Sequence, residues 1–219
     1  MSNFNRIKAY LKRDYLLERR NKSIIGSALV YLLSVVFICL HAFETLDPDS
    51  WTALFWIVLL FTVLNAVGRS FERESGSAYL YHFHLAKPTQ IILAKLFINA
   101  LFAIILGLFA FGIFVVFLGS SISNYTYFLL TLIVGSAAIG STFTLTAAIT
   151  ARVQGNLVLM AILSLPLILP LVLLLVKMTS RVFGAYGTSS GLPLLGGLIG
   201  FNVLVIILSV VLFPYLWRD

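Results

Sequence analysis

The sequence predicts an all-α integral membrane protein with six transmembrane helices, preceded by an amphipathic helix on the membrane surface. Two observations carry this prediction. Of 219 residues, 60% are hydrophobic and 11% are charged, whereas a soluble domain has about 45–50% and about 25%. The apolar residues also form six long runs separated by polar connections. Most of the chain is therefore expected to have lipid as its solvent.

Each of the six apolar runs is long enough to cross a bilayer, because a hydrocarbon core of about 30 Å takes roughly 20 helical residues. The connections leave no room for a soluble domain of useful size. The chain therefore divides into a cytoplasmic segment, 1–23, and a six-span membrane domain, 24–219. The predicted spans are Ile24–Phe43, Trp51–Val67, Ile91–Leu118, Tyr125–Ala151, Leu157–Lys177 and Leu192–Leu216.

Basic residues gather on one side of the predicted membrane. The N-terminal segment, the second and fourth connections and the C-terminal tail carry thirteen Lys and Arg residues. The other three connections carry two, Lys177 and Arg181. Because cytoplasmic loops are enriched in Lys and Arg, both termini are predicted to be cytoplasmic. The same rule explains the net charge of +7, so no nucleic-acid partner is expected.

The first 23 residues show helical periodicity. Phe4, Ile7, Leu11 and Tyr15 recur at spacings of three and four, and basic residues cover the rest of the helix surface. This pattern predicts an amphipathic helix that lies on the cytoplasmic membrane face in contact with anionic lipid. The alternative interpretation is a solvated basic tail that only sets the topology.

The signatures of catalysis and of metal binding are absent from the sequence. It contains no GxxxxGKS/T loop for nucleotide phosphates and no HExxH, CxxC, CxxCH or GxSxG motif. Its single cysteine, Cys39, lies in an apolar run. The three histidines, His41, His82 and His84, have no acid or thiol at ligand spacing. We therefore expect a protein that is not an enzyme and that binds no cofactor or metal itself.

Prolines and small residues mark special positions within the spans. Pro166 and Pro170 stand four apart in the fifth span, where each removes a backbone donor, so a kink is predicted there and a hinge is one interpretation. Small residues predict close helix packing in membranes. Such small residues recur in two spans, at Gly135, Ser136, Gly140 and Ser141 in the fourth and at Gly196, Gly197 and Gly200 in the sixth. The sequence does not decide whether these two groups pack inside the chain or against a partner.

The second connection, 68–90, is the longest on the predicted cytoplasmic side. It contains a charged cluster, then Gly76 that allows a turn, and then residues 78–85, which can form a short helix before the third span. Such a segment suits docking onto a cytosolic protein, because charges set the register and apolar side chains provide buried contacts. The residues predicted to dock are Arg69, Phe71, Glu72, Arg73, Glu74, Gly76, Leu80 and Leu85.

A family resemblance rests on the Phe71–Gly76 cluster with Leu80, Leu85 and Pro88, the Ile91–Lys95 entry to the third span, the Arg13–Arg20 opening and the Leu165–Pro170 stretch. The connection resembles the coupling segment of type-2 ABC exporter permeases. The whole chain, more narrowly, resembles the haem exporter protein B (CcmB) family. Each motif is loose, but their order and spacing are together specific.

The resemblance implies a subunit of the cytochrome c maturation machinery in the bacterial inner membrane, with a cytoplasmic coupling helix between spans 2 and 3. Its implied partners are a cytosolic ABC ATPase that binds the ATP, a haem-handling membrane subunit and a small membrane subunit. A second copy of the chain is a further candidate. Haem is the candidate cargo. The family's tryptophan-rich haem motif belongs to the partner subunit, so Trp51 and Trp217 are interpreted as interfacial anchors.

Two other functional classes stay open. An ABC-2 type permease for a lipid, drug or glycan would share the coupling segment but would have different neighbouring subunits. A non-transporting membrane scaffold would not depend on a nucleotide-hydrolysing partner. The coupling segment also departs from the family pattern, with Ser75 before Gly76 and Tyr81–His84 after it.

Overall fold

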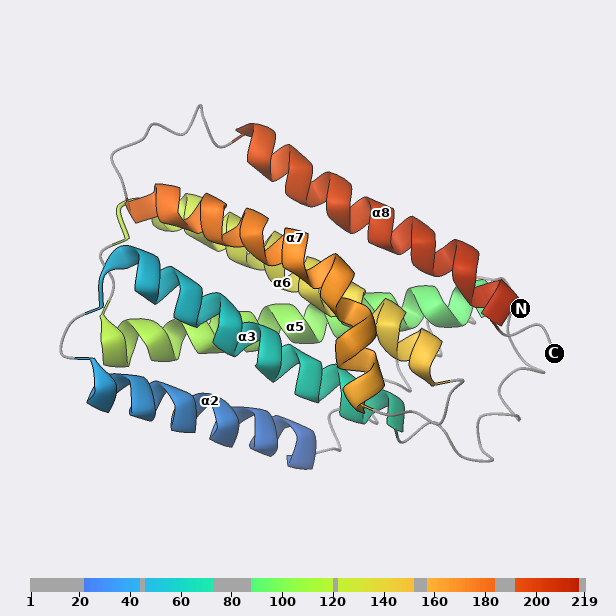
Figure 1. Cartoon of the computed structure of the whole chain (residues 1–219), viewed down its shortest axis with the longest axis horizontal. Coiled ribbons are helices and arrows are strands. Elements are labelled where there is room, and N and C mark those ends of the chain that lie inside the picture. Colours follow the sequence, from blue (N-terminus) through green and yellow to red (C-terminus); the bar gives the residue numbers. More distant parts are fainter. Residues whose placement is uncertain are drawn as a thin grey trace.

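The computed structural model describes residues 22–43, 46–72, 88–119, 122–151, 157–183 and 192–216. These residues form six helices, and consecutive helices run in opposite directions along the long axis of the bundle (Figure 1). The connections α2–α3, α5–α6 and α7–α8 therefore share one end of the bundle. The helices are α2 (Lys22–Ala42), α3 (Pro48–Glu72), α5 (Pro88–Leu118), α6 (Tyr125–Thr150), α7 (Leu157–Phe183) and α8 (Leu192–Leu216).

Five of these helices are long and apolar enough to cross a membrane. They contain candidate spans of 21 residues in α3, 30 in α5, 26 in α6, 25 in α7 and 23 in α8. Helix α2 is 21 residues long, and its apolar stretch is the shorter Gly26–Ala42. The predicted all-helical membrane architecture is thus confirmed for five spans. Of the predicted surface helix, 1–23, residues 1–21 lie outside the described residues, and the last two belong to the start of α2. The predicted coupling helix, 78–85, also lies outside the described residues.

Side-chain caps fix the start of two helices. Before α3, the Asp47 carboxylate accepts a hydrogen bond of 3.1 Å from the backbone N–H of Ser50, and Pro48 occupies the first helical position, which needs no donor. Hydrogen bonds from the Ser50 side chain and then its backbone hold the pKa of Asp47 below its usual range. The Asn124 side chain caps α6 in the same way, by accepting from Tyr127 N–H at 3.1 Å.

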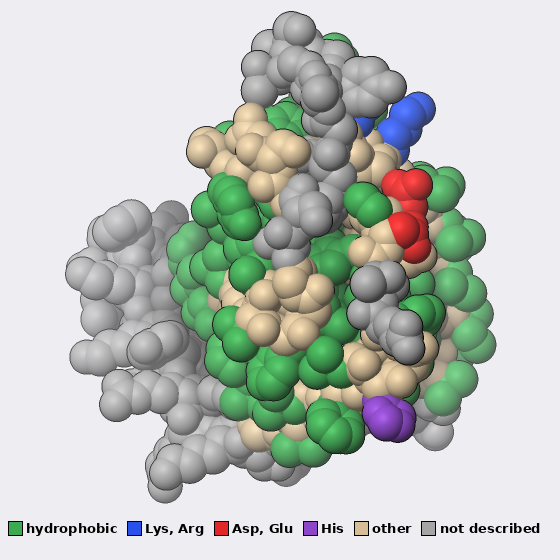
Figure 2. Space-filling model, turned by 90° about the vertical axis from the view of Figure 1, so that its left-hand side faces the viewer, with side chains coloured by type: hydrophobic (Ala, Val, Ile, Leu, Met, Phe, Trp, Pro, Cys, Tyr) green, Lys and Arg blue, Asp and Glu red, His purple; other side chains and the backbone are tan. Residues whose placement is uncertain are grey.

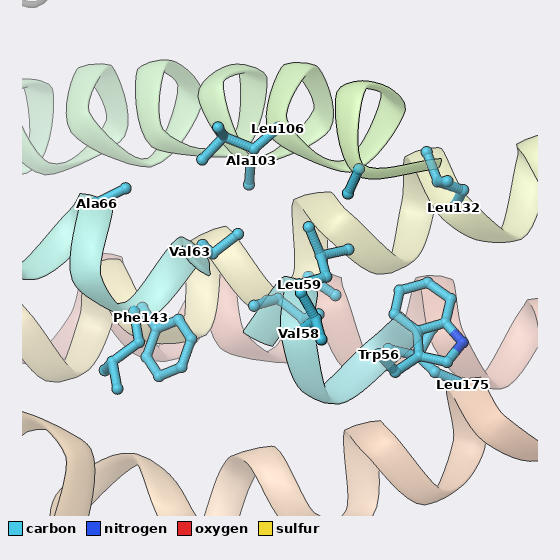
Figure 3. Packing of buried hydrophobic residues seen from close by; sticks show 14 of the residues in the cluster. Trp56, Val58, Leu59, Val63, Ala66, Ala103, Leu106, Leu132, Phe143 and Leu175 are labelled. Carbon is cyan, nitrogen blue, oxygen red and sulfur yellow. The ribbon is translucent and has the colours of Figure 1, made fainter. Parts of the chain in front are cut away.

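Helix α6 lies at the centre of the bundle. Of an 18-residue apolar stretch of its span, 72% is buried inside the chain, against 17% for the corresponding stretch of α8. Helix α3 is nearly as enclosed. Figure 3 shows side chains of α3 meeting those of α5, α6 and α7 in one apolar core. Helices α3 and α6 are therefore the interior elements, and the others cover them.

The outer surface of the bundle is apolar. Phe37 on α2 and Leu173 on α7 are 71% and 70% exposed, which would be costly in water over such an area. In a bilayer these side chains meet acyl chains instead. Buried positions, by contrast, include many hydroxyl groups, such as Thr142 and Thr146 of α6.

Trp51 occupies a different environment from the predicted one. Its side chain is 3% exposed, and its indole Nε1 donates a hydrogen bond of 2.9 Å to the Gly119 carbonyl. Its ring stacks on Phe55 at a centroid distance of 5.4 Å. Trp51 therefore joins α3 to the end of α5 inside the bundle and does not face the lipid interface. Trp217 lies outside the described residues.

Candidate functional site

The predicted docking residues lie at and beyond the end of α3. Arg69, Phe71 and Glu72 belong to its last turn, so the helix of the second span continues without a break into the charged cluster. Their side chains are not described. The remaining docking residues, Arg73, Glu74, Gly76, Leu80 and Leu85, lie outside the described residues, and their role stays a prediction.

The opposite end of the bundle faces the viewer in Figure 2, where hydrophobic side chains outnumber charged ones. His41 stands in the last turn of α2 and is exposed. Asp47 and Asp49 open α3, and Arg181 lies near the end of α7. Within the described residues, His, Cys, Asp and Glu side chains do not gather into a group of three or more.

Pro166 and Pro170 lie within the continuous helix α7, and both are exposed on its outer side. Figure 1 shows α7 bent along its course. Each proline lacks the N–H that would bond to the carbonyl four residues earlier. The Ser164 hydroxyl nearby donates to the Ala161 carbonyl at 2.7 Å. This part of α7 therefore has fewer backbone hydrogen bonds than a regular helix, and a hinge here stays a prediction.

Helix α3 touches α7 near the end that carries the docking segment. A side chain on Gly68 would collide with Leu157 in the first turn of α7 and would come within 3.6 Å of the Met160 sulfur. Met160 is itself buried. Gly68 directly precedes Arg69. The docking segment thus begins where the Leu157 side chain of α7 packs against the bare backbone of α3 at Gly68.

A second α3–α7 contact lies nearer the other end of the bundle. The Trp56 indole Nε1 donates a hydrogen bond of 2.9 Å to Thr179 Oγ1, and Thr179 donates to the Leu175 carbonyl at 2.9 Å. Both Trp56 and Thr179 are fully buried. Figure 3 places the Trp56 ring beside Leu175. A Cβ on Gly135 of α6 would lie 2.9 Å from that ring, so Gly135 makes room for it.

Helices α5 and α6 approach each other closely at Gly140. A Cβ there would lie 2.9 Å from the Asn99 carbonyl oxygen and 2.9 Å from the Ala103 Cβ. The Asn99 amide donates to Thr144 Oγ1 at 2.9 Å. One turn before Asn99, Lys95 is only 7% exposed. The Asn99 side chain therefore faces α6.

The small residues of α6 are buried, whereas those of α8 are exposed. Gly135, Ser136, Gly140 and Ser141 of α6 are buried between helices of the same chain. Gly196, Gly197 and Gly200 of α8 are exposed, and a Cβ on any of them would meet no atom within 4 Å in the described part of the structure. The α6 set therefore serves packing inside the chain. Sequence reasoning missed the Trp56–Thr179 bond, because no local signal links residues so far apart.

Replacing Asn99 with leucine should have a small effect. Leucine branches at the same carbon as asparagine, and the change removes the hydrogen bond to Thr144, whose hydroxyl still donates to the Gly140 carbonyl at 2.7 Å. Hydrogen bonds between membrane helices contribute about 0.6 kcal/mol on average. We expect unfolding in mixed detergent micelles to shift by about 1 kcal/mol or less. A loss several times larger would show that the Asn99 amide supports more than this contact.

The chain is similar to a known protein family along nearly its whole length. The model of the family described as CcmB protein matches residues 5–214. The matched stretch contains α2, α3, α5, α6 and α7 completely and all but the last two residues of α8. No curated protein matches the chain. The match thus covers almost all of the described structure and both candidate regions, the docking segment and the proline pair.

Proposed function

The chain belongs to the CcmB protein family, whose members are membrane components of haem export and cytochrome c maturation, and we propose that it is the permease subunit of an ABC-type complex in the bacterial inner membrane. In this role it links a separate cytosolic ATPase to haem delivery or to release of a haem-loaded chaperone. The observation that carries the proposal is the family match over residues 5–214.

The antiparallel helix order supports a six-span arrangement. With α2 as the first span, an even number of crossings brings both termini to the same side of the membrane. Helix α2 has 21 residues, which at 1.5 Å per residue is about 31 Å, close to the hydrocarbon thickness. The basic N-terminal segment and the docking segment then lie on the cytoplasmic side.

The course of α3 supports docking on residues 69–85. Because α3 runs without a break to Glu72, a force applied to the charged cluster would act directly on a helix that lies inside the bundle. The chain has no phosphate-binding loop of its own, so the ATP would bind to the docked partner. A haem-handling membrane subunit, a small membrane subunit and a second copy of the chain complete the proposed complex.

Changing both acidic residues of the cluster tests the docking assignment. Glu72→Ala combined with Glu74→Ala is expected to leave membrane insertion intact and to reduce cytochrome c yield several-fold. Single changes should be milder, because an exposed ion pair contributes under about 1 kcal/mol. The measurements are haem staining of cytochrome c and the amount of chain in the membrane. Glu44→Ala with Asp49→Ala removes the same charge in the sequence between the first and second predicted spans and should keep the yield normal.

Normal cytochrome c yield in the Glu72 and Glu74 double variant would remove the docking assignment. A mild-detergent pull-down of the tagged chain, with ATPase activity assayed on the eluate, then separates the functional classes. An ATPase together with a haem-handling protein supports cytochrome c maturation. An ATPase with other partners supports a permease for a different cargo, and the absence of an ATPase supports a scaffold.

A further inference from the structure

Helix α3 holds α7 at two points. We call the contact of Gly68 with Leu157 the proximal contact, because it adjoins the docking segment, and the hydrogen bond from Trp56 to Thr179 the distal contact. The proximal contact is steric and involves only side-chain atoms of α7. The distal contact is directional and fully buried. Both ends of α7 are therefore fixed to the same helix.

The two contacts are spaced differently along the two helices. Gly68 follows Trp56 by 12 residues, whereas Thr179 follows Leu157 by 22 residues. At 1.5 Å per residue these separations correspond to about 18 Å of α3 and about 33 Å of α7. A straight α7 lying beside α3 could not match both contacts easily. Figure 1 shows that α7 is bent, so part of its length curves away from α3 between the contacts.

Both prolines of α7 lie between the two contacts along the chain. Pro166 and Pro170 lie between Leu157 and Thr179, and both are exposed on the side that faces away from the core. Because two backbone hydrogen bonds are missing on one face, bending there costs less than elsewhere in the helix. The distal contact lies beyond the prolines, where the Trp56 ring fits against Gly135 and Leu175.

We propose that Trp56 and Thr179 are positioning residues that hold the distal half of α7 on α3, so that a displacement of α3 at the docking segment moves this half while the proline segment flexes. The inference rests on the proposed function, since it needs an ATPase that acts on α3. The Trp56–Thr179 hydrogen bond, although distant from the docking segment, would then couple the movement of α3 to that of α7. This coupling requires that the hydrogen bond stays formed while α7 bends.

A double-variant cycle tests the distal contact. Trp56→Phe keeps an aromatic ring and removes the N–H donor, and Thr179→Val keeps the volume and removes the acceptor. Thr62→Val is the matched control, because the Thr62 hydroxyl is equally buried on α3 but donates only within its own helix, to the Val58 carbonyl at 2.7 Å. Thermal unfolding of the purified chain in detergent reports whether the two residues are energetically coupled.

Two functional readouts complete the experiment: cytochrome c yield in cells and ATP hydrolysis by the complex purified through the tagged chain. We expect Trp56→Phe, Thr179→Val and the double variant to lower cytochrome c yield by a similar factor, at least about threefold, with ATP hydrolysis kept within about twofold. Thr62→Val should change neither. The smaller Thr179→Val change keeps the test valid if Trp56→Phe folds poorly.

A strain that lacks the chain separates the inference from the function on which it rests. If that strain matures cytochrome c normally, the proposed function is wrong and the inference falls with it. If that strain fails while well-folded Thr179→Val supports normal cytochrome c yield, only the positioning role is overturned. A loss of yield equal to that of the Thr62→Val control would also overturn it.

Discussion

Replacing Phe55 with alanine is expected to destabilise the helix bundle by about 2–4 kcal/mol. Phe55 is fully buried in α3 and lies at the centre of a group of aromatic rings from three helices. Removing its ring would leave a cavity that these neighbours cannot fill without moving their helices. Its ring centroid lies 5.2 Å from Trp56, 5.3 Å from Phe114, 5.4 Å from Trp51 and 5.7 Å from Phe128.

The expected loss of stability in Phe55→Ala is limited because the separated helices remain in an apolar solvent. In soluble proteins a buried Phe→Ala change costs about 3–5 kcal/mol, which combines a transfer term with a cavity term. Separated helices in a bilayer still keep Phe55 in an apolar medium, so the transfer term is small. The lost dispersion contacts and aromatic pairs remain. The effect should therefore fall at or below the lower part of the range for soluble proteins.

Unfolding of the purified chain in mixed detergent micelles measures this effect. Phe37→Ala is the control, because it removes the same ring from α2 at a position that is 71% exposed. We expect a change below about 0.5 kcal/mol there. Equal losses for Phe55→Ala and Phe37→Ala would contradict the assignment of Phe55 to the core.

The helix positions could be predicted closely from the sequence. Helix α8 spans the predicted Leu192–Leu216, and α6 ends one residue before the predicted Ala151. Helices α3 and α7 continue beyond their predicted spans, to Glu72 and Phe183. Apolar runs end at the first charged residues, but backbone hydrogen bonding does not depend on side-chain polarity. A hydropathy pattern therefore locates the membrane-crossing part and underestimates the helix.

The inward faces could not be predicted in the same way. In lipid, an apolar side chain is as stable outside the bundle as inside it, so hydrophobicity does not select the core. Phe37 is exposed while Thr142 is buried, the reverse of a soluble protein. The same ambiguity explains why the sequence predicts an interfacial position for Trp51, which the structure buries. Small and hydroxyl-bearing residues such as Gly140 were the more informative signal, although they left the partner helix undefined.

The candidate site was predictable only in its position along the chain. Charges at Glu72 and a long connection mark a segment outside the membrane, but they carry no information on its contacts. The Trp56–Thr179 bond joins residues 123 apart in sequence. A pairing at that distance depends on how α3 crosses α7, which neither local propensity nor periodicity determines.

Gly140→Leu is expected to have the second large effect, a loss of about 3 kcal/mol or more. A Cβ at this position would already lie 2.9 Å from the Asn99 carbonyl oxygen and 3.2 Å from the Ala100 Cα. Backbone atoms cannot rotate away as a flexible side chain can. A leucine would therefore force α5 and α6 apart and would break the hydrogen bond between Asn99 and Thr144 as well.

Two controls separate this steric effect from the general cost of a larger residue. Gly112→Leu on α5 and Gly200→Leu on α8 add the same side chain where a Cβ meets no described atom within 4 Å, so both should unfold at nearly the same denaturant concentration as the unchanged chain. Leucine is also the better helix former, by up to about 1 kcal/mol, which opposes any loss. If Gly140→Leu resembled these controls, α5 and α6 would not meet at Gly140. If it alone unfolded early and became sensitive to protease, the close approach of the two helices at this glycine would account for the stability of the bundle centre.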